Sequence, residues 1–222
     1  MSVRIKLCGV RRVSDALLCA AGGADELGVV FAAGSRRRIT LDEARAIRAA
    51  LPPSVPLTGV FLDATLDELS TAASTGLFSA LQLHGAVPSG AGLLDVALVR
   101  ALQLKSDAFL EELELTPPGG GPAYSRLLLD GPAGGSGLSF AWELARRVRA
   151  RLSKAQTLFV AGGLHAGNVA RAIGAAAPDG VDVASGIEGP DGFKDPERVR
   201  AFVAAARGRS TDGATGASTK RQ

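Results

Sequence analysis

The sequence predicts an α/β protein in which eight parallel β-strands alternate with helices and close into a single (β/α)8 barrel, or TIM barrel. Apolar, strand-like runs recur along the chain, each followed by a polar or glycine-containing break and then by a segment with helical periodicity. Many of these runs are rich in valine and leucine on both faces, as in a parallel sheet that is buried on both sides. Periodicity alone also allows an open, doubly wound sheet, but eight consecutive units favour closure.

Eight segments are predicted to be strands. The first, residues 3–8 (VRIKLC), alternates apolar with basic residues and stops at Cys8, which raises the question of why a strand should end on a cysteine. The other predicted strands, in chain order, are residues 26–31, 56–61, 80–84, 96–104, 126–130, 157–162 and 180–186.

Helices are predicted between and after these strands, at residues 13–22, 41–50, 65–75, 87–92, 106–113, 139–152, 166–176 and 195–206. Ser14, Thr40 and Thr65 are the residue types that favour helix N-caps, and Thr40 with Glu43 has the spacing of a capping box. The sequence after the fourth strand, GAVPSGAGLLD, leaves little room for a regular helix, so the fourth and fifth units are the least regular.

The length of 222 residues suits one barrel domain, which we expect to span residues 1–207. Because 46% of the residues are hydrophobic and only 5% are aromatic, the core is predicted to be aliphatic. The C-terminal tail, residues 208–222, lacks apolar residues that could anchor it and is predicted to be disordered.

Composition excludes several classes of function. The net charge is only +3 and the few aromatic residues are scattered, so we expect no nucleic-acid binding. No apolar run is long enough to cross a membrane. The two cysteines, Cys8 and Cys19, form neither a disulfide framework nor a metal-ligand spacing, which predicts a cytoplasmic protein without a metal site.

The active sites of such barrels lie at the carboxyl ends of the strands. Cys8 ends the first predicted strand there; it is either a small buried thiol or, if its pKa is lowered, a base or nucleophile, whereas Cys19 is expected to be buried in a helix. Asp130 ends the strand RLLLD, where partial burial would raise its pKa and suit it to acid catalysis, although it could simply cap a turn. His84, on the fourth strand, is a general acid, a ring contact or a structural histidine.

Two loops carry the small residues of an anion site. Gly162 and Gly163 follow the seventh strand, and Ser185 and Gly186 follow the eighth. Each pair alone could make a turn or a cap, but together they favour a phosphate site built from backbone N–H groups. The run Arg36–Arg38 is either a solvated loop or a site for a carboxylate or phosphate.

Over residues 3–207 the chain resembles the phosphoribosylanthranilate isomerase family. The resemblance is carried, in the right order, by IKLCGVRR, GADELGVVF, SRRRI, TGVFLDAT, ALQLHG, LLLDGPAGGSGLSFAW, VAGGLHAGNVARAI and VDVASGIEGPDGFKDPERVRAF. The sequence departs from the family pattern at Arg11, usually threonine, at Arg38, often aromatic, and at Ala141, commonly aspartate.

The resemblance implies an Amadori rearrangement in tryptophan biosynthesis, in which N-(5-phosphoribosyl)anthranilate becomes 1-(2-carboxyphenylamino)-1-deoxyribulose 5-phosphate without a cofactor. It assigns Cys8 as the general base, Asp130 as the general acid and Arg37 as the ligand of the anthranilate carboxylate. The other implied substrate-binding residues are Gln82, His84, Gly162, Gly163, Asp182, Ser185 and Gly186.

Two other functions remain as alternatives. A related histidine-pathway isomerase would be expected to use two aspartates, which Cys8 argues against. A barrel that only binds a phosphorylated metabolite would have no need of both Cys8 and Asp130. The partner is in each case a small phosphorylated molecule, and the sequence allows a monomer or a homodimer.

Overall fold

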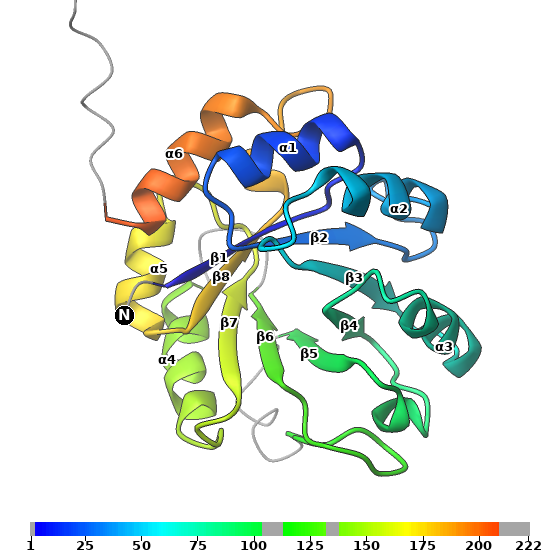
Figure 1. Cartoon of the computed structure of the whole chain (residues 1–222). Coiled ribbons are helices and arrows are strands. Elements are labelled where there is room, and N and C mark those ends of the chain that lie inside the picture. The colour runs from blue at the N-terminus through cyan, green and yellow to red at the C-terminus, as the bar shows by residue number, and fades with distance from the viewer. Residues whose placement is uncertain (1–2, 104–112, 132–137, 209–222) are drawn as a thin grey trace, which may run out of the picture.

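The computed structural model describes residues 3–103, 113–131 and 138–208, and these residues form a closed barrel (Figure 1). Every neighbouring pair of strands is parallel, and β8 pairs with β1 through Leu7 and Val183, which excludes the open sheet. The strands are β1 (Arg4–Cys8), β2 (Glu26–Val30), β3 (Leu57–Leu62), β4 (Ala80–His84), β5 (Ala97–Gln103), β6 (Arg126–Asp130), β7 (Thr157–Ala161) and β8 (Gly180–Val183). The predicted barrel is therefore confirmed.

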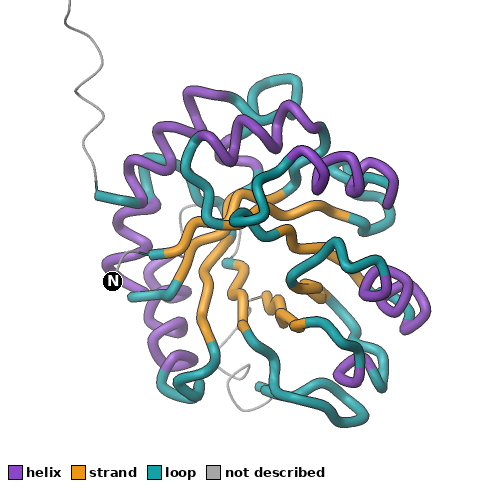
Figure 2. Tube along the Cα trace, in the orientation of Figure 1, coloured by secondary structure: helices purple, strands orange, loops and turns teal. Residues whose placement is uncertain are grey.

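Helices surround the ring of strands (Figure 2). They are α1 (Val13–Ala21), α2 (Leu41–Ala50), α3 (Leu66–Ser74), α4 (Leu138–Arg149), α5 (Val169–Ala176) and α6 (Pro196–Ala206). The helix predicted at 87–92 is wrong, since that stretch holds only a short 3-10 helix, Ala91–Leu93, after a left-handed Gly90. The strand predicted to run to residue 186 ends at Val183, and a 3-10 turn, Ser185–Ile187, follows it.

Two predictions fall on parts of the chain that the structure does not describe. The helix predicted at 106–113 lies outside the described residues except for Leu113, and the tail 208–222 lies outside them except for Gly208. Within the part that is described, no helix is long and apolar enough to span a membrane.

Capping explains where α2 and α3 begin. Thr40 and Thr65 each accept a hydrogen bond from the backbone N–H of the glutamate three residues on, and both helices have complete capping boxes. The prediction that Ser14 caps the first helix is wrong, because α1 begins at Val13 and the residue before it is an extended Arg12. Arg12 instead bonds Asp15 at 2.8 Å and lies over the Phe193 ring, which ties the start of α1 to the loop before α6.

The strands present different chemistry on their two faces. On β1, the side chains of Ile5 and Leu7 join the large aliphatic core between the barrel and its helices. Lys6 and Cys8 lie on the opposite face of the strand, toward the barrel interior, because side chains alternate along a strand. The prediction of an aliphatic core is therefore confirmed for the layer between the strands and the helices, whereas the barrel interior also contains buried charged side chains.

The lower interior of the barrel is closed by a buried ion pair. Arg126 donates to Glu26 at 2.8 Å and lies over the ring of Phe159, and Thr58 also donates to Glu26 at 2.7 Å. These contacts fill the amino-terminal half of the barrel. A pocket lies at the opposite rim, where the strands have their carboxyl ends. Cys8 and Asp130, the last residues of β1 and β6, line it.

Candidate active site

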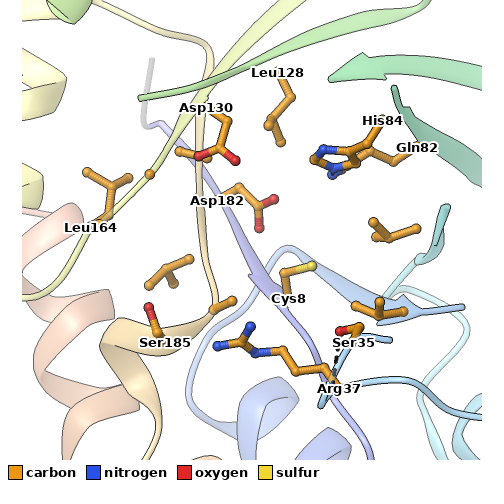
Figure 3. A pocket seen from close by; sticks show the side chains of 17 residues that line it. Cys8, Ser35, Arg37, Gln82, His84, Leu128, Asp130, Leu164, Asp182 and Ser185 are labelled. Carbon is orange, nitrogen blue, oxygen red and sulfur yellow. Dashed lines mark hydrogen bonds between the residues drawn. The ribbon is translucent and has the colours of Figure 1, made fainter. Parts of the chain in front are cut away.

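A pocket of about 260 Å³ opens at the carboxyl-terminal rim of the barrel (Figure 3). Nine of the ten residues predicted for the site line it: Cys8, Arg37, Gln82, His84, Asp130, Gly162, Gly163, Asp182 and Ser185. The pocket thus brings together residues that are separated by more than a hundred positions in the chain. Gly186 does not line it.

Cys8 ends β1 and is 7% exposed at the pocket wall. Burial raises the pKa of its thiol above the ordinary value, and the neighbouring Lys6 ammonium opposes that rise. The direction is the reverse of the downward shift that would favour the thiolate. Lys194 donates to the Cys8 carbonyl at 2.6 Å and so fixes the end of the strand.

Asp130 ends β6 and points into the same pocket. Burial, and then the charge of Asp182, raise the pKa of the Asp130 carboxyl to about 6. The direction agrees with the expectation from the apolar strand that precedes it. In Figure 3 the Asp182 carboxylate lies between Asp130 and Cys8, so the acid and the thiol face the pocket from different sides.

A chain of hydrogen bonds runs across the floor of the pocket. Lys6, fully buried, donates to Asp182 Oδ2 at 2.8 Å and to Gln82 Oε1 at 2.9 Å. The Gln82 amide lies 2.8 Å from His84 Nε2. Among the residues that the structure describes, Asp182 Oδ1 is buried and has no hydrogen-bond partner. The sequence analysis did not identify Lys6 as a site residue. Its alternation with Ile5 and Leu7 was the available signal, because it places Lys6 on the same face of the strand as Cys8.

His84 is not suited to be a general acid. Burial, together with the nearby charge of Lys6, lowers its pKa to about 4, so the imidazole is neutral at pH 7. A neutral ring whose Nε2 accepts from the Gln82 amide carries its proton on Nδ1. Among the roles considered for His84, this environment supports the contact and structural roles.

Arg37 reaches the pocket from the β2–α2 loop and is held by Glu188. The Glu188 carboxylate is 3% exposed and also contacts Arg36 at 2.7 Å and Lys194 at 3.2 Å. Three cations therefore surround one buried carboxylate beside the pocket. Sequence reasoning missed Glu188 and Lys194, because nothing local in the sequence pairs them with a loop some 150 positions earlier.

The two small-residue loops meet at the pocket. Gly162 and Gly163 have positive φ angles of 89° and 60°, a conformation that glycine adopts without strain. The Asn168 amide holds this loop by donating to the Gly163 carbonyl at 3.0 Å. Gly186 packs directly against the Leu164 carbonyl, where a Cβ would collide, so its contribution is to let the two loops approach each other.

Ligand groups for a metal do not gather anywhere in residues 3–103, 113–131 and 138–208: no three His, Cys, Asp or Glu side chains are placed to share an ion. What the pocket does offer is a half-buried carboxyl, a thiol, a guanidinium and two glycine-containing loops. Such a set suits proton transfer on an anionic ligand.

Comparison with known proteins gives a consistent result. The family model for N-(5'-phosphoribosyl)anthranilate (PRA) isomerase matches residues 5–205. The chain is 40% identical over 213 residues to the N-(5'-phosphoribosyl)anthranilate isomerase of Pseudomonas paraeruginosa (strain DSM 24068 / PA7), covering 95% of this chain and 98% of that protein.

Solved structures agree with this match. A phosphoribosylanthranilate isomerase in complex with reduced 1-(o-carboxyphenylamino)-1-deoxyribulose 5-phosphate superposes with a TM-score of 0.77 and 31% identity, covering 93% of this chain and 99% of that one. Monomers of the dimeric phosphoribosylanthranilate isomerase from Thermotoga maritima match with a TM-score of 0.76 and 31% identity, again covering 93% of this chain and 99% of that one. The chain belongs to the N-(5'-phosphoribosyl)anthranilate isomerase family.

Proposed function

We propose that this protein catalyses the Amadori rearrangement of N-(5-phosphoribosyl)anthranilate to 1-(2-carboxyphenylamino)-1-deoxyribulose 5-phosphate in tryptophan biosynthesis. The observation that carries the proposal is one pocket lined by both Cys8 and Asp130, in a chain of this family. The reaction needs one acid and one base: it opens the sugar ring and moves protons, and the oxidation at C2′ is balanced by the reduction at C1′ of the same molecule, so it requires no cofactor.

Asp130 is the proposed general acid. With a pKa of about 6, its carboxyl keeps a proton far more readily than an exposed aspartate does. It would donate that proton to the furanose ring oxygen as the C1′–O bond breaks. The nitrogen lone pair forms the C1′=N bond, and the product is a ring-opened, protonated Schiff base.

Cys8 is the proposed general base. Its thiolate would remove the C2′ proton, the C–H electrons would form a C1′=C2′ bond, and the iminium nitrogen would become neutral. The resulting enolamine tautomerises to the ketone. The positive charge of the Schiff base also favours the thiolate beside it, which offsets the effect of burial.

The remaining pocket residues are proposed to bind the substrate's two anionic ends. The Arg37 guanidinium suits the anthranilate carboxylate, since it is a planar, permanently charged donor. The loops of Gly162, Gly163 and Ser185, packed together at Gly186, suit the phosphate. The ribose part lies between these two anionic ends, and Gln82, His84 and Asp182 would contact it.

The test is loss of anthranilate-type fluorescence when the purified protein is added to phosphoribosylanthranilate that is generated in situ. Wild type and Cys19→Ala, whose thiol is buried in α1 away from the pocket, are expected to consume the substrate. Cys8→Ala and Asp130→Ala are expected to bind it but not to turn it over. Lack of turnover by wild type would contradict the proposed reaction and favour a barrel that only binds a metabolite.

Turnover of the histidine-pathway aminoaldose in place of phosphoribosylanthranilate would favour the related isomerase.

We further propose a single isomerase domain over residues 1–207 in the cytoplasm, where the buried thiols of Cys8 and Cys19 stay reduced. The proposed quaternary structure is a monomer or a homodimer. The molar mass from light scattering, measured as the protein elutes from a size-exclusion column, distinguishes the two.

A further inference from the structure

We propose that Lys6 is a positioning residue for the proposed base: its ammonium group, fixed beneath the pocket by Asp182 and Gln82, stabilises the Cys8 thiolate. This inference rests on the proposed role of Cys8. It concerns a side chain that does not line the pocket and that the catalytic steps above do not use.

Lys6 is held in one place. It stands two residues before Cys8 on β1, so both side chains lie on the same face of the strand. Its Nζ donates to Asp182 Oδ2 at 2.8 Å and to Gln82 Oε1 at 2.9 Å, and the residue is fully buried. An ammonium group has three N–H donors, and these two hydrogen bonds use two of them.

Gly28 provides the space that Lys6 and Cys8 share. It stands opposite Cys8 in the β1–β2 pairing. A Cβ on residue 28 would lie 2.7 Å from the Cys8 sulfur and 3.2 Å from Lys6 Nζ. The sulfur and the ammonium therefore both border the volume that the missing side chain leaves.

The groups around Cys8 have opposing effects. Burial disfavours the thiolate, and Lys6 is the largest of the charges that favour it, followed by Lys194. Asp182 opposes it, while Arg37 contributes positive charge from the β2–α2 loop. Around the rest of the pocket, His84 is neutral at pH 7 and Asp130 carries the proposed acid proton.

A purely structural ion pair would predict a different result from the proposed one. If Lys6 only neutralised Asp182, its removal together with that carboxylate would change stability and leave the titration of the Cys8 thiol unchanged. If Lys6 stabilises the thiolate, the thiol must become harder to ionise. Burial disfavours the charged form of Lys6, but the negative charges of Asp182, Cys8 and Glu26 together outweigh it and raise the pKa of Lys6, so the ammonium stays charged.

The experiment measures how the rate of Cys8 alkylation by iodoacetamide depends on pH, by mass spectrometry of the intact protein. All variants carry Cys19→Ala, so that Cys8 is the thiol observed. The parent is compared with Asp182→Asn and with Lys6→Met/Asp182→Asn. The double variant is used because Lys6→Met alone would leave a buried carboxylate without its counterion.

With Asp182→Asn, the alkylation midpoint is expected to fall below that of the parent, because the Lys6 charge then acts without the opposing carboxylate. With Lys6→Met/Asp182→Asn, it is expected to rise by about one pH unit or more above Asp182→Asn, which corresponds to about tenfold slower alkylation at a fixed pH below both midpoints. Equal midpoints for these two variants would overturn the inference.

The matched control is the other ion pair of the barrel interior, removed by Glu26→Gln/Arg126→Met. This pair is also buried, and neither residue is among the charges that shift the pKa of Cys8, so the midpoint should stay close to the parent value. A rise as large as that of the Lys6 variant would mean that loosening of the barrel causes the effect. If the double Lys6 variant does not fold, Lys6→Gln/Asp182→Asn, which keeps a polar pair at the two positions, takes its place, and a midpoint equal to that of Asp182→Asn overturns the inference. Alkylation does not depend on turnover, so this result is separate from the test of the reaction.

Discussion

The Arg37 guanidinium and the Glu188 carboxylate form a two-point ion pair, with Nε 2.6 Å from Oε1 and Nη2 2.9 Å from Oε2. The pair joins the β2–α2 loop to the segment after β8. It fixes the plane of the guanidinium and leaves the Nη1 group free of Glu188, beside the pocket that Arg37 lines. A loop arginine thereby acquires a defined direction for recognising a carboxylate.

Replacement of Arg37 by alanine should raise KM more than it lowers kcat. A charge-assisted contact that is similar in the ground and transition states is worth about 1.5 to 3 kcal/mol, so KM should rise by roughly tenfold to a hundredfold. Steady-state fluorescence kinetics measure both constants. Arg38→Ala, next in the chain but outside the pocket lining, is the control, and an unchanged KM in Arg37→Ala would contradict the carboxylate assignment.

Glu188→Gln should destabilise the protein and raise KM. An amide has one acceptor oxygen and no charge, so it cannot bind Arg37 at two points or balance the buried Lys194. We expect a loss of about 3 kcal/mol in the free energy of unfolding, measured in urea at pH 7.

The same substitution should change the pH dependence of stability. Burial opposes the charged form of Glu188, but Arg37 and Lys194 outweigh it and hold its pKa below the ordinary value. Its ionised form therefore contributes stability above the ordinary carboxyl pKa, and that contribution is lost as the pH falls through the lowered pKa. The gap between wild type and Glu188→Gln should narrow on acidification; a constant gap would be inconsistent with this role.

Asp130→Asn should stabilise the protein while it abolishes turnover. Burial raises the pKa of Asp130 to about 6, so the folded protein holds this proton more tightly than the unfolded chain does. The free energy of unfolding therefore falls as the pH rises through the ordinary carboxyl pKa and up to about 6. The gain from asparagine should be about 1 kcal/mol larger at pH 8 than at pH 5. Urea unfolding at the two pH values measures this difference, and an equal gain at both would refute the buried-acid environment.

The pH profile of kcat/KM should show two breaks. The reactive form has Asp130 protonated and Cys8 ionised, although Asp130 has a pKa of about 6 and burial raises that of the thiol. Activity should therefore rise to a break near pH 6, stay level through neutral pH and fall above the pKa of the thiol. In Asp182→Asn the acidic break should move lower, since the Asp182 charge raises the pKa of Asp130. A profile that falls from pH 6 onward would exclude this pair of roles.

Local patterns in the sequence predicted most of the fold because they reflect local physics. The strand boundaries of Ala80–His84 and Arg126–Asp130 match the predicted ones, since apolar runs of that length bury a strand. The capping boxes at Thr40 and Thr65 depend only on residues within one helical turn. Ser14 failed as a cap because a distant contact, Arg12 with the ring of Phe193, helps to set the start of α1.

The barrel, its order of elements and the residues gathered at its rim, including Cys8 and Asp130, could be predicted from the amino-acid sequence alone. Which face of β1 turns inward, and therefore that Lys6 lies beneath the thiol and beside Asp182, became visible in the folded barrel. The folded barrel also shows that Glu188 holds Arg37 and that burial raises, not lowers, the pKa of Cys8. The reason is that charge pairing and desolvation depend on distances between residues far apart in the chain, and closure of the barrel sets those distances.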